Sequence, residues 1–194
     1  MIYLEYCMSM KININNISGS FLIASPSLDD PNFRQSVVLI CEHSRDGAFG
    51  LIINKILMNS FVPLRNAFDI KSTLVDLPVY YGGPVRPEQG YVLYSPFDPK
   101  YGSVKVSGDV AVTASREMLY EIAEGKGPEK FMFALGFSGW IPNQLEDELM
   151  TDSWLVAPLD QKIIFELPVK ERWKYAANSI GVDFERFVDR SGSA

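Results

Sequence analysis

Apolar residues along this chain gather in short runs separated by turn signals, and the first runs predict strands. Residues 20–25 form one run, and residues 35–43 form a second in which Val37–Ile40 make both faces apolar. A strand of this kind is typical of a sheet covered on two sides. Asp46-Gly47 marks a turn before a third run at 49–54. The second and third runs therefore predict a β-hairpin with a loop of roughly 4–5 residues.

Later runs predict further strands and helices in mixed order. Strands are expected at 78–81, 91–95, 104–106, 130–137 and 154–157. Helices are expected at 60–68, 115–124, 143–150 and 169–180, with a last turn at 184–188, while 161–166 fits a helix or a strand. In the helix at 143–150, Asn143 and Glu146 occupy the positions of a capping box.

The order of these elements favours an α+β fold. Because strands and helices do not alternate as regular βαβ units, we expect a single compact domain with a mixed, partly antiparallel β-sheet flanked by helices. A barrel-like closure of that sheet is a second arrangement of the same strands.

Residues 17–194 are expected to form the single domain, since no long Pro-, Gly- or Ser-rich linker divides them. Residues 1–16 are interpreted as an N-terminal extension. This segment carries Glu5 and lacks the basic and apolar regions of a signal peptide. The chain also has no apolar run of about 18 residues that could span a membrane. We therefore expect a cytoplasmic protein with no membrane span.

The charge balance argues against direct nucleic-acid binding. The formal net charge is −6 and the pI is about 4.9, whereas nucleic-acid binders usually carry a basic patch that displaces phosphate counterions. The densest basic cluster is Lys170, Arg172 and Lys174, which Glu171 interrupts. It is predicted to be a solvated face of a helix.

Short motifs recur along most of the chain in a known arrangement. They are Gly19–Pro26, Asp30–Phe33, Ser36–Val38, Glu42-His43, Gly47-Ala48, Gly50-Leu51, Asn54, Gly82–Val85, Ala134–Trp140, Gln144–Glu148, Trp154-Leu155, Phe165, Trp173, Ala176, Gly181 and Gly192–Ala194. Together they resemble the YqgE/AlgH family of uncharacterised bacterial proteins, also called UPF0301, over residues 17–194.

The resemblance implies a compact α/β or α+β fold and brings no catalytic mechanism with it. One branch of the family is named for an effect on alginate production and is labelled a transcriptional regulator. Two positions depart from the family pattern: Phe137, where the family often has Tyr, and the turn at 141–143, where it usually has glycines. If either position contacts a ligand, this chain binds that ligand differently.

Cys41 and His43 are the first candidates for chemistry. His43 is the only histidine, and the two cysteines, Cys7 and Cys41, are expected to be reduced thiols. Residues two apart on a strand share a face with their Cβ atoms roughly 6–7 Å apart, which is long for a thiol–imidazole hydrogen bond. The structural interpretation is a buried Cys41 and a hydrogen-bonded His43. The alternative is a reactive thiol at Cys41, which requires a lowered pKa and access.

Other catalytic and cofactor motifs are absent from the sequence. Zinc requires three or four ligands, typically Cys and His at short spacings. No G-x-S-x-G motif is present, because residues 136–140 have a different spacing. Residues 125–128 lack the pattern of a phosphate-binding loop. We therefore assign no catalytic residue, no metal and no cofactor, and favour a protein that is not an enzyme.

Polar and aromatic residues beside the apolar runs form the candidate ligand or partner surface. They are Arg34, His43, Asn54, Gly83, Trp140, Gln144 and Glu146. Trp140 is either an exposed anchor with polar partners or a core residue, in which case Glu146 caps the helix. We expect a non-enzymatic binding or regulatory module that acts through an unknown protein or small ligand, and the family resemblance implies a link to transcriptional regulation through a partner. The alternative is an enzyme or redox sensor that uses Cys41.

Overall fold

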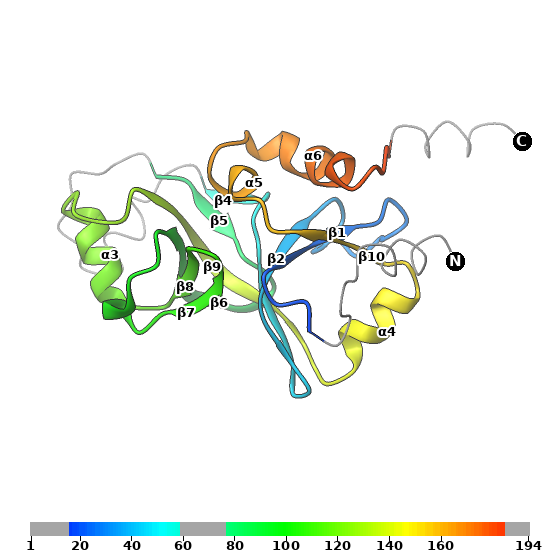
Figure 1. Ribbon diagram of the computed structural model, residues 1–194, viewed down its shortest axis with the longest axis horizontal. Helices are drawn as coiled ribbons and strands as arrows, with labels where there is room; N and C mark the ends of the chain where they lie inside the picture. The colour runs from blue at the N-terminus through cyan, green and yellow to red at the C-terminus, as the bar shows by residue number, and fades with distance from the viewer. Residues whose placement is uncertain (1–15, 59–76, 185–194) are drawn as a thin grey trace, which may run out of the picture.

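One long strand, β9 (Lys130–Trp140), joins the two halves of the sheet. The structure is a computed structural model that describes residues 16–58 and 77–184 (Figure 1). Along one of its edges, residues 133–135 of β9 pair with one half of the sheet and residues 138–140 pair with the other half. Gly136 lies between these two segments with φ 70°, a conformation that favours glycine.

The other strands are β1 (Ser20–Ala24), β2 (Val37–Ser44), β3 (Gly47–Ile52), β4 (Ile56–Met58), β5 (Val79–Tyr81), β6 (Val85–Ser95), β7 (Val104–Ser107), β8 (Val110–Thr113) and β10 (Trp154–Pro158). The α-helices are α3 (Arg116–Ala123), α4 (Gln144–Met150), α5 (Gln161–Phe165) and α6 (Arg172–Ser179). Two short 3₁₀ helices are η1 (Pro99–Tyr101) and η2 (Val169–Glu171).

The strands form one mixed, open sheet. Their order is β10-β1-β2-β3-β9-β6-β8-β7, with β5 beside β9 and β4 beside β5. Among the described strands, β5 and β9 are parallel and every other pairing is antiparallel. The described ends of this order, β10 and β7, do not pair, so the barrel-like closure does not form. The expected α+β fold is confirmed.

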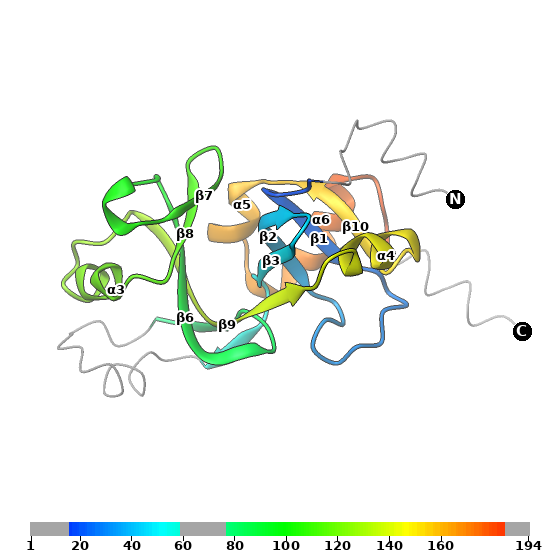
Figure 2. The same ribbon diagram turned by 90° about the horizontal axis from the view of Figure 1, so that it is seen from below.

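Three apolar cores fix the helices on the sheet. The inner core lies under α5 and α6 and contains Phe21, Leu39, Met132, Ile163 and Ala176. The α4-side core lies on the opposite face of β1 and β2 and contains Leu22, Val38, Ile40, Leu145, Leu149 and Trp154. The α3-side core contains Val92, Tyr94, Met118, Ile122 and Phe133. Figures 1 and 2 show α3 and α4 at opposite ends of the molecule.

The β2–β3 hairpin forms as expected, with a shorter loop. Only Arg45 and Asp46 separate the strands, because the ladder continues to the Ser44–Gly47 pair and Gly47 adopts φ 124°. The expected loop of four to five residues is therefore wrong. In addition, a bulge between Ile40 and Glu42 inserts one extra residue into β2.

The capping box expected for α4 is also wrong. Asn143 is in the left-handed region with φ 66° and makes no side-chain cap. By contrast, Ser115 caps α3 by accepting hydrogen bonds from the N–H groups of Glu117 and Met118. In α4 the Glu146 carboxylate is turned to a distant partner instead, as described below.

Several expectations fall outside the described residues. These are the helix at 60–68, nearly all of the turn at 184–188, and the extension at 1–16 apart from its last residue. The domain boundary at residue 17 therefore stays a prediction. In the described part of the chain, no helix has both the length and the apolar character needed to cross a membrane.

Candidate functional site

Glu148 on α4 organises the candidate surface. Its Oε2 atom accepts the indole N–H of Trp140 at 3.0 Å and that of Trp154 at 2.7 Å. Its Oε1 atom accepts the side-chain N–H of Gln144 at 2.9 Å, and Gln144 in turn accepts the backbone N–H of Ile141. One carboxylate thus connects the end of β9, the start of β10 and the first turn of α4 by charge-assisted hydrogen bonds.

His43 forms the second attachment of α4 to the sheet. Its Nδ1 atom accepts the backbone N–H of Ile17 at 3.2 Å, which places the proton of the neutral ring on Nε2. Nε2–H then donates to Oε1 of Glu146 at 3.0 Å. The His43 side chain is only 1% exposed, so both ring nitrogens serve the structure rather than solvent.

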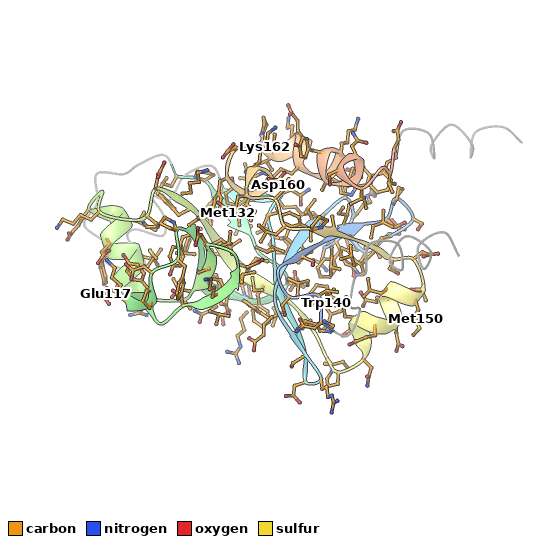
Figure 3. All side chains as sticks on the ribbon, viewed as in Figure 1. Glu117, Met132, Trp140, Met150, Asp160 and Lys162 are labelled. Atoms are coloured by element: carbon orange, nitrogen blue, oxygen red, sulfur yellow. The ribbon has the colours of Figure 1, made fainter. Side chains whose placement is uncertain are left out.

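Trp140 belongs to an aromatic cluster and is not an exposed anchor. It is 5% exposed, and its ring stacks near that of Phe33 with centroids 6.0 Å apart. Trp154 meets both rings edge-on, at 5.5 Å from Phe33 and 6.1 Å from Trp140. Figure 3 labels Trp140 on the α4 side of the sheet. The core interpretation of Trp140 therefore describes its position.

The seven candidate residues form one group and a scattered remainder. His43, Trp140, Gln144 and Glu146 come together around α4. Within the described residues, the other three, Arg34, Asn54 and Gly83, make no side-chain hydrogen bond or ring contact with that group.

Arg34 lies in the loop before β2, and Asn54, which follows β3, bonds to the end of that loop. Arg34 is exposed. The Asn54 side chain accepts the Val37 N–H at 2.7 Å and donates to the Gln35 carbonyl at 2.8 Å. Gln35 has φ 55°, so Asn54 fixes a strained backbone conformation at the start of β2.

Gly83 allows two backbones to approach closely. A Cβ atom at Gly83 would lie 2.3 Å from the carbonyl carbon of Phe137, and one at Gly136 would lie 2.4 Å from the Gly83 oxygen. The turn between β5 and β6 therefore packs directly on β9 through two glycines.

Cys41 and His43 lie on opposite faces of β2. The bulge at Cys41 shifts the alternation, so Cys41 joins the inner core while His43 faces α4. The expectation that they share a face is wrong for this reason. Cys41 is 2% exposed, and burial, with a smaller effect of the Glu42 carboxylate, raises the pKa of its thiol. These features favour the structural interpretation of Cys41.

Lys55 and Tyr81 were missed by the sequence reasoning. Lys55 Nζ donates to the Asn32 carbonyl at 2.7 Å, and the Tyr81 hydroxyl donates to the Asn32 side chain at 2.9 Å. Burial lowers the pKa of the Lys55 amine. Tyr81 thus holds the loop before β2 against β5, and Lys55 holds it against the segment between β3 and β4. Neither residue stands in a sequence pattern that signals this role.

A pocket of about 280 Å³ opens between β5, the start of β9 and the end of α5. Tyr80, Phe131, Phe133 and Phe165 give it an aromatic wall, and Lys130 and Glu166 form an ion pair of 2.7 Å beside it. Within residues 16–58 and 77–184, no group of three His, Cys, Asp or Glu side chains is placed to hold a metal ion.

The sequence profile of the AlgH-like family matches residues 21–185. The chain belongs to the AlgH-like family. A UPF0301 protein of Methylococcus capsulatus is 42% identical over 179 residues, covering 91% of this chain and 95% of that protein. A UPF0301 protein of Nitrosococcus oceani is 41% identical over 177 residues, covering 90% of this chain and 95% of that protein.

Two solved structures resemble this AlgH-like domain. The solution structure of the AlgH protein from Pseudomonas aeruginosa matches with a TM-score of 0.74 and 36% identity, covering 92% of this chain and 96% of that one. A crystal structure of a protein from Corynebacterium diphtheriae matches with a TM-score of 0.66 and 21% identity, covering 84% and 86%. The second likeness shows the fold alone.

Both departures from the AlgH-like pattern have a place in the structure. Phe137 packs against Phe49 and Tyr91, with ring centroids 5.2 and 5.9 Å away, so this position is a half-buried aromatic contact. The turn at 141–143 leads from β9 into α4, and its Ile141 is 71% exposed. The departure in this turn therefore adds an apolar side chain to the surface beside α4.

Proposed function

We propose that this AlgH-like protein is a non-enzymatic cytoplasmic binding module that acts in regulation through a protein partner. The α4 surface, defined as Ile141, Asp147, Met150 and Asp152, is the proposed contact area. The observation that carries this proposal is that Ile141 and Met150 are 71% and 67% exposed, the highest values among the large hydrophobic side chains of the described residues.

Helix α4 is firmly held, which suits it to present these side chains. Glu148 and Glu146 tie one side of the helix to Trp140, Trp154 and His43. A surface that is already ordered loses less conformational entropy when a partner binds. Exposed apolar side chains on a rigid element are typical of interaction sites.

Charge indicates the chemistry of the partner. Asp147 and Asp152 are exposed on and just after α4, and the whole chain has a net charge of −6. An acidic and apolar surface is complementary to a basic, apolar patch on another protein. The same charge repels nucleic acid, so regulation through a protein partner fits this chain better than direct DNA contact.

The absence of enzymatic activity is supported by how the polar side chains near α4 are used. Both ring nitrogens of His43, both carboxylate oxygens of Glu148, and the side-chain oxygen and nitrogen of Gln144 hold structural hydrogen bonds. A general base needs its lone pair available to a substrate proton. In this cluster no imidazole lone pair is left for such a role.

Site-specific photocrosslinking in the native host tests the proposal. A photoreactive amino acid replaces Met150 in the full-length protein, and a matched variant carries it at Tyr120 on α3, which is 43% exposed. We expect one reproducible protein adduct from position 150 and not from position 120. The adduct should disappear when Ile141→Ser is added. Equal crosslinking at both positions, or an adduct that Ile141→Ser leaves intact, contradicts the proposal.

A further inference from the structure

Arg172, the first residue of α6, is buried without a carboxylate partner in the described part of the chain. Its exposed fraction is 4%, and none of the ion pairs within residues 16–58 and 77–184 includes it. The expectation of a solvated basic face is therefore wrong for this residue. Because a buried charge is costly unless it is paired, such an arginine calls for a ligand or for strong neutral partners.

Arg172 makes two strong hydrogen bonds, and its other polar contacts are weak. Nε–H donates to the Leu167 carbonyl at 3.0 Å, and Nη1 donates to the Ile53 carbonyl. By contrast, Nη2 reaches the Tyr80 hydroxyl only at 3.4 Å, and Nη1 lies 4.0 Å from the Met132 sulfur. Nη2 thus has donor capacity that its neighbours barely use.

Both weak contacts of Arg172 are made to residues that line the pocket. Tyr80 and Met132 are both part of the pocket wall, and the guanidinium carbon of Arg172 lies 5.4 Å from the centre of the Tyr80 ring. Figure 3 labels Met132 on β9. A molecule in the pocket is therefore separated from the buried positive charge by one side chain only.

Tyr80 both lines the pocket and contacts the buried charge through its hydroxyl. Its oxygen accepts from Arg172, so its own hydrogen is available to a second acceptor. Within residues 16–58 and 77–184, this hydroxyl donates no hydrogen bond to another protein group. A phenol that accepts from a cation is polarised into a better donor, and an anion is the acceptor that gains most from it.

We propose that this pocket binds a small organic anion, a carboxylate on a flat apolar body. The carboxylate accepts the Tyr80 O–H and faces the field of Arg172, while the apolar body packs against Met132 and Phe165, which lie on the same face of the sheet as Tyr80. The volume of about 280 Å³ lies at the lower limit of small-molecule sites, so the ligand has the size of one aromatic ring with substituents. This ligand site is independent of the proposed partner surface on α4.

The charges at the rim do not oppose this assignment. Glu166 forms an ion pair of 2.7 Å with Lys130. Their hydrogen bond raises the pKa of Lys130 and lowers the pKa of Glu166, so each partner stabilises the charged form of the other. Glu129 is exposed to solvent, where screening weakens its field. The preference for an anion therefore arises at the Tyr80 wall rather than at the entrance.

Titration of the full-length protein with benzoate and benzamide tests the proposal. These probes have the same shape and differ in charge. The ¹³C-methyl NMR signal of Met132, assigned with Met132→Leu, reports on the pocket. We expect a saturable shift with benzoate at millimolar concentrations, up to about 20 mM, and an affinity at least about tenfold lower for benzamide. No saturable shift with benzoate, or equal affinities for the two probes, overturns the proposal.

The conservative variant Tyr80→Phe isolates the hydroxyl. It keeps the aromatic wall and removes only the donor, so we expect benzoate to bind about tenfold more weakly, as for loss of a hydrogen bond to a charged group. Tyr120→Phe, at an exposed tyrosine on α3, is the matched control and should leave benzoate binding unchanged. If Tyr80→Phe binds benzoate as tightly as the native chain, the anion does not contact Tyr80 and the proposal is wrong.

Discussion

Trp140 and Trp154 share a single hydrogen-bond acceptor, the Oε2 atom of Glu148. The two indole rings meet edge-on with centroids 6.1 Å apart, and they come from the end of β9 and the start of β10. Helix α4 lies between these strands in the chain. The carboxylate of Glu148 on α4 therefore links the end of β9 to the start of β10.

Replacing Glu148 by Gln should lower the free energy of unfolding by about 1–3 kcal/mol. The amide has one oxygen for two indole donors and one Gln144 donor, so at least one of these N–H groups loses its partner. Urea denaturation followed by tryptophan fluorescence measures the change. Glu117→Gln, at an exposed glutamate on α3 labelled in Figure 3, is the control and should change the stability by less than about 0.5 kcal/mol.

Variants of His43 should separate its two hydrogen bonds. His43→Asn keeps an acceptor near the position of Nδ1, and His43→Gln keeps a donor near the position of Nε2. We expect the Ile17 amide to remain protected from hydrogen exchange in the Asn variant and to lose protection in the Gln variant. His43→Ala, which removes both bonds, should be the least stable, by about 1–3 kcal/mol. Equal exchange of the Ile17 amide in all three variants contradicts this assignment.

Cys41 should resist alkylation in the folded protein. A Cys7→Ser variant leaves Cys41 as the only thiol. Because burial raises the thiol pKa, little thiolate forms at neutral pH, and iodoacetamide should react only after denaturant is added. Mass spectrometry measures the adduct. Fast alkylation of the native protein at pH 7 would instead support the reactive-thiol hypothesis.

The same pKa shift predicts a loss of stability in alkali. The Cys41 thiol stays neutral in the folded state, whereas in the unfolded chain it ionises near its ordinary value of 9.0. The unfolded state therefore releases a proton that the folded state keeps, and stability falls as the pH rises above that value. In a Cys7→Ser background, Cys41→Ala should reduce this alkaline slope. An unchanged slope between pH 8 and 10, about the range in which a free thiol titrates, contradicts the assignment.

Gly83 should tolerate no side chain. A Cβ atom there would lie 2.3 Å from both the carbonyl carbon and oxygen of Phe137, and φ is 151°. We expect Gly83→Ala to lower the free energy of unfolding by more than about 2 kcal/mol, because two backbones must separate. Gly102→Ala is the matched control: its φ is 59° and it faces open space, so only the left-handed backbone cost of about 1–2 kcal/mol applies. Equal losses for the two variants would show that steric contact at Gly83 is unimportant.

The sequence predicts the strands that are long and apolar. It does not predict the short strands that form only because a neighbouring strand pairs with them. The pattern at 35–43 and 49–54 correctly indicates β2 and β3. Strands β4 and β8 were not predicted, since their three and four residues carry too little periodicity to stand out. They become strands because β5, β6 and β7 supply the hydrogen bonds. Pairing of this kind is a tertiary property.

Partners that are distant in the sequence also explain why the predictions for Glu146, Arg172 and Cys41 were wrong. Glu146 fits a capping box by local spacing, yet it bonds to His43, which is 103 positions away. Arg172 fits a solvated face, yet the carbonyl of Ile53, 119 positions away, takes part in burying it. The bulge at Cys41 depends on how β3 aligns with β2. None of these relationships leaves a periodic signal in the sequence.

The position of β9 in the chain determines when the sheet can be completed during translation. Before residues 130–140 leave the ribosome, β3, β5 and β6 each lack the strand that later pairs with them. Their open edges are templates for pairing with other chains. Nascent chains shorter than the full β9 strand should therefore be the aggregation-prone and chaperone-dependent species, and productive folding begins late in translation.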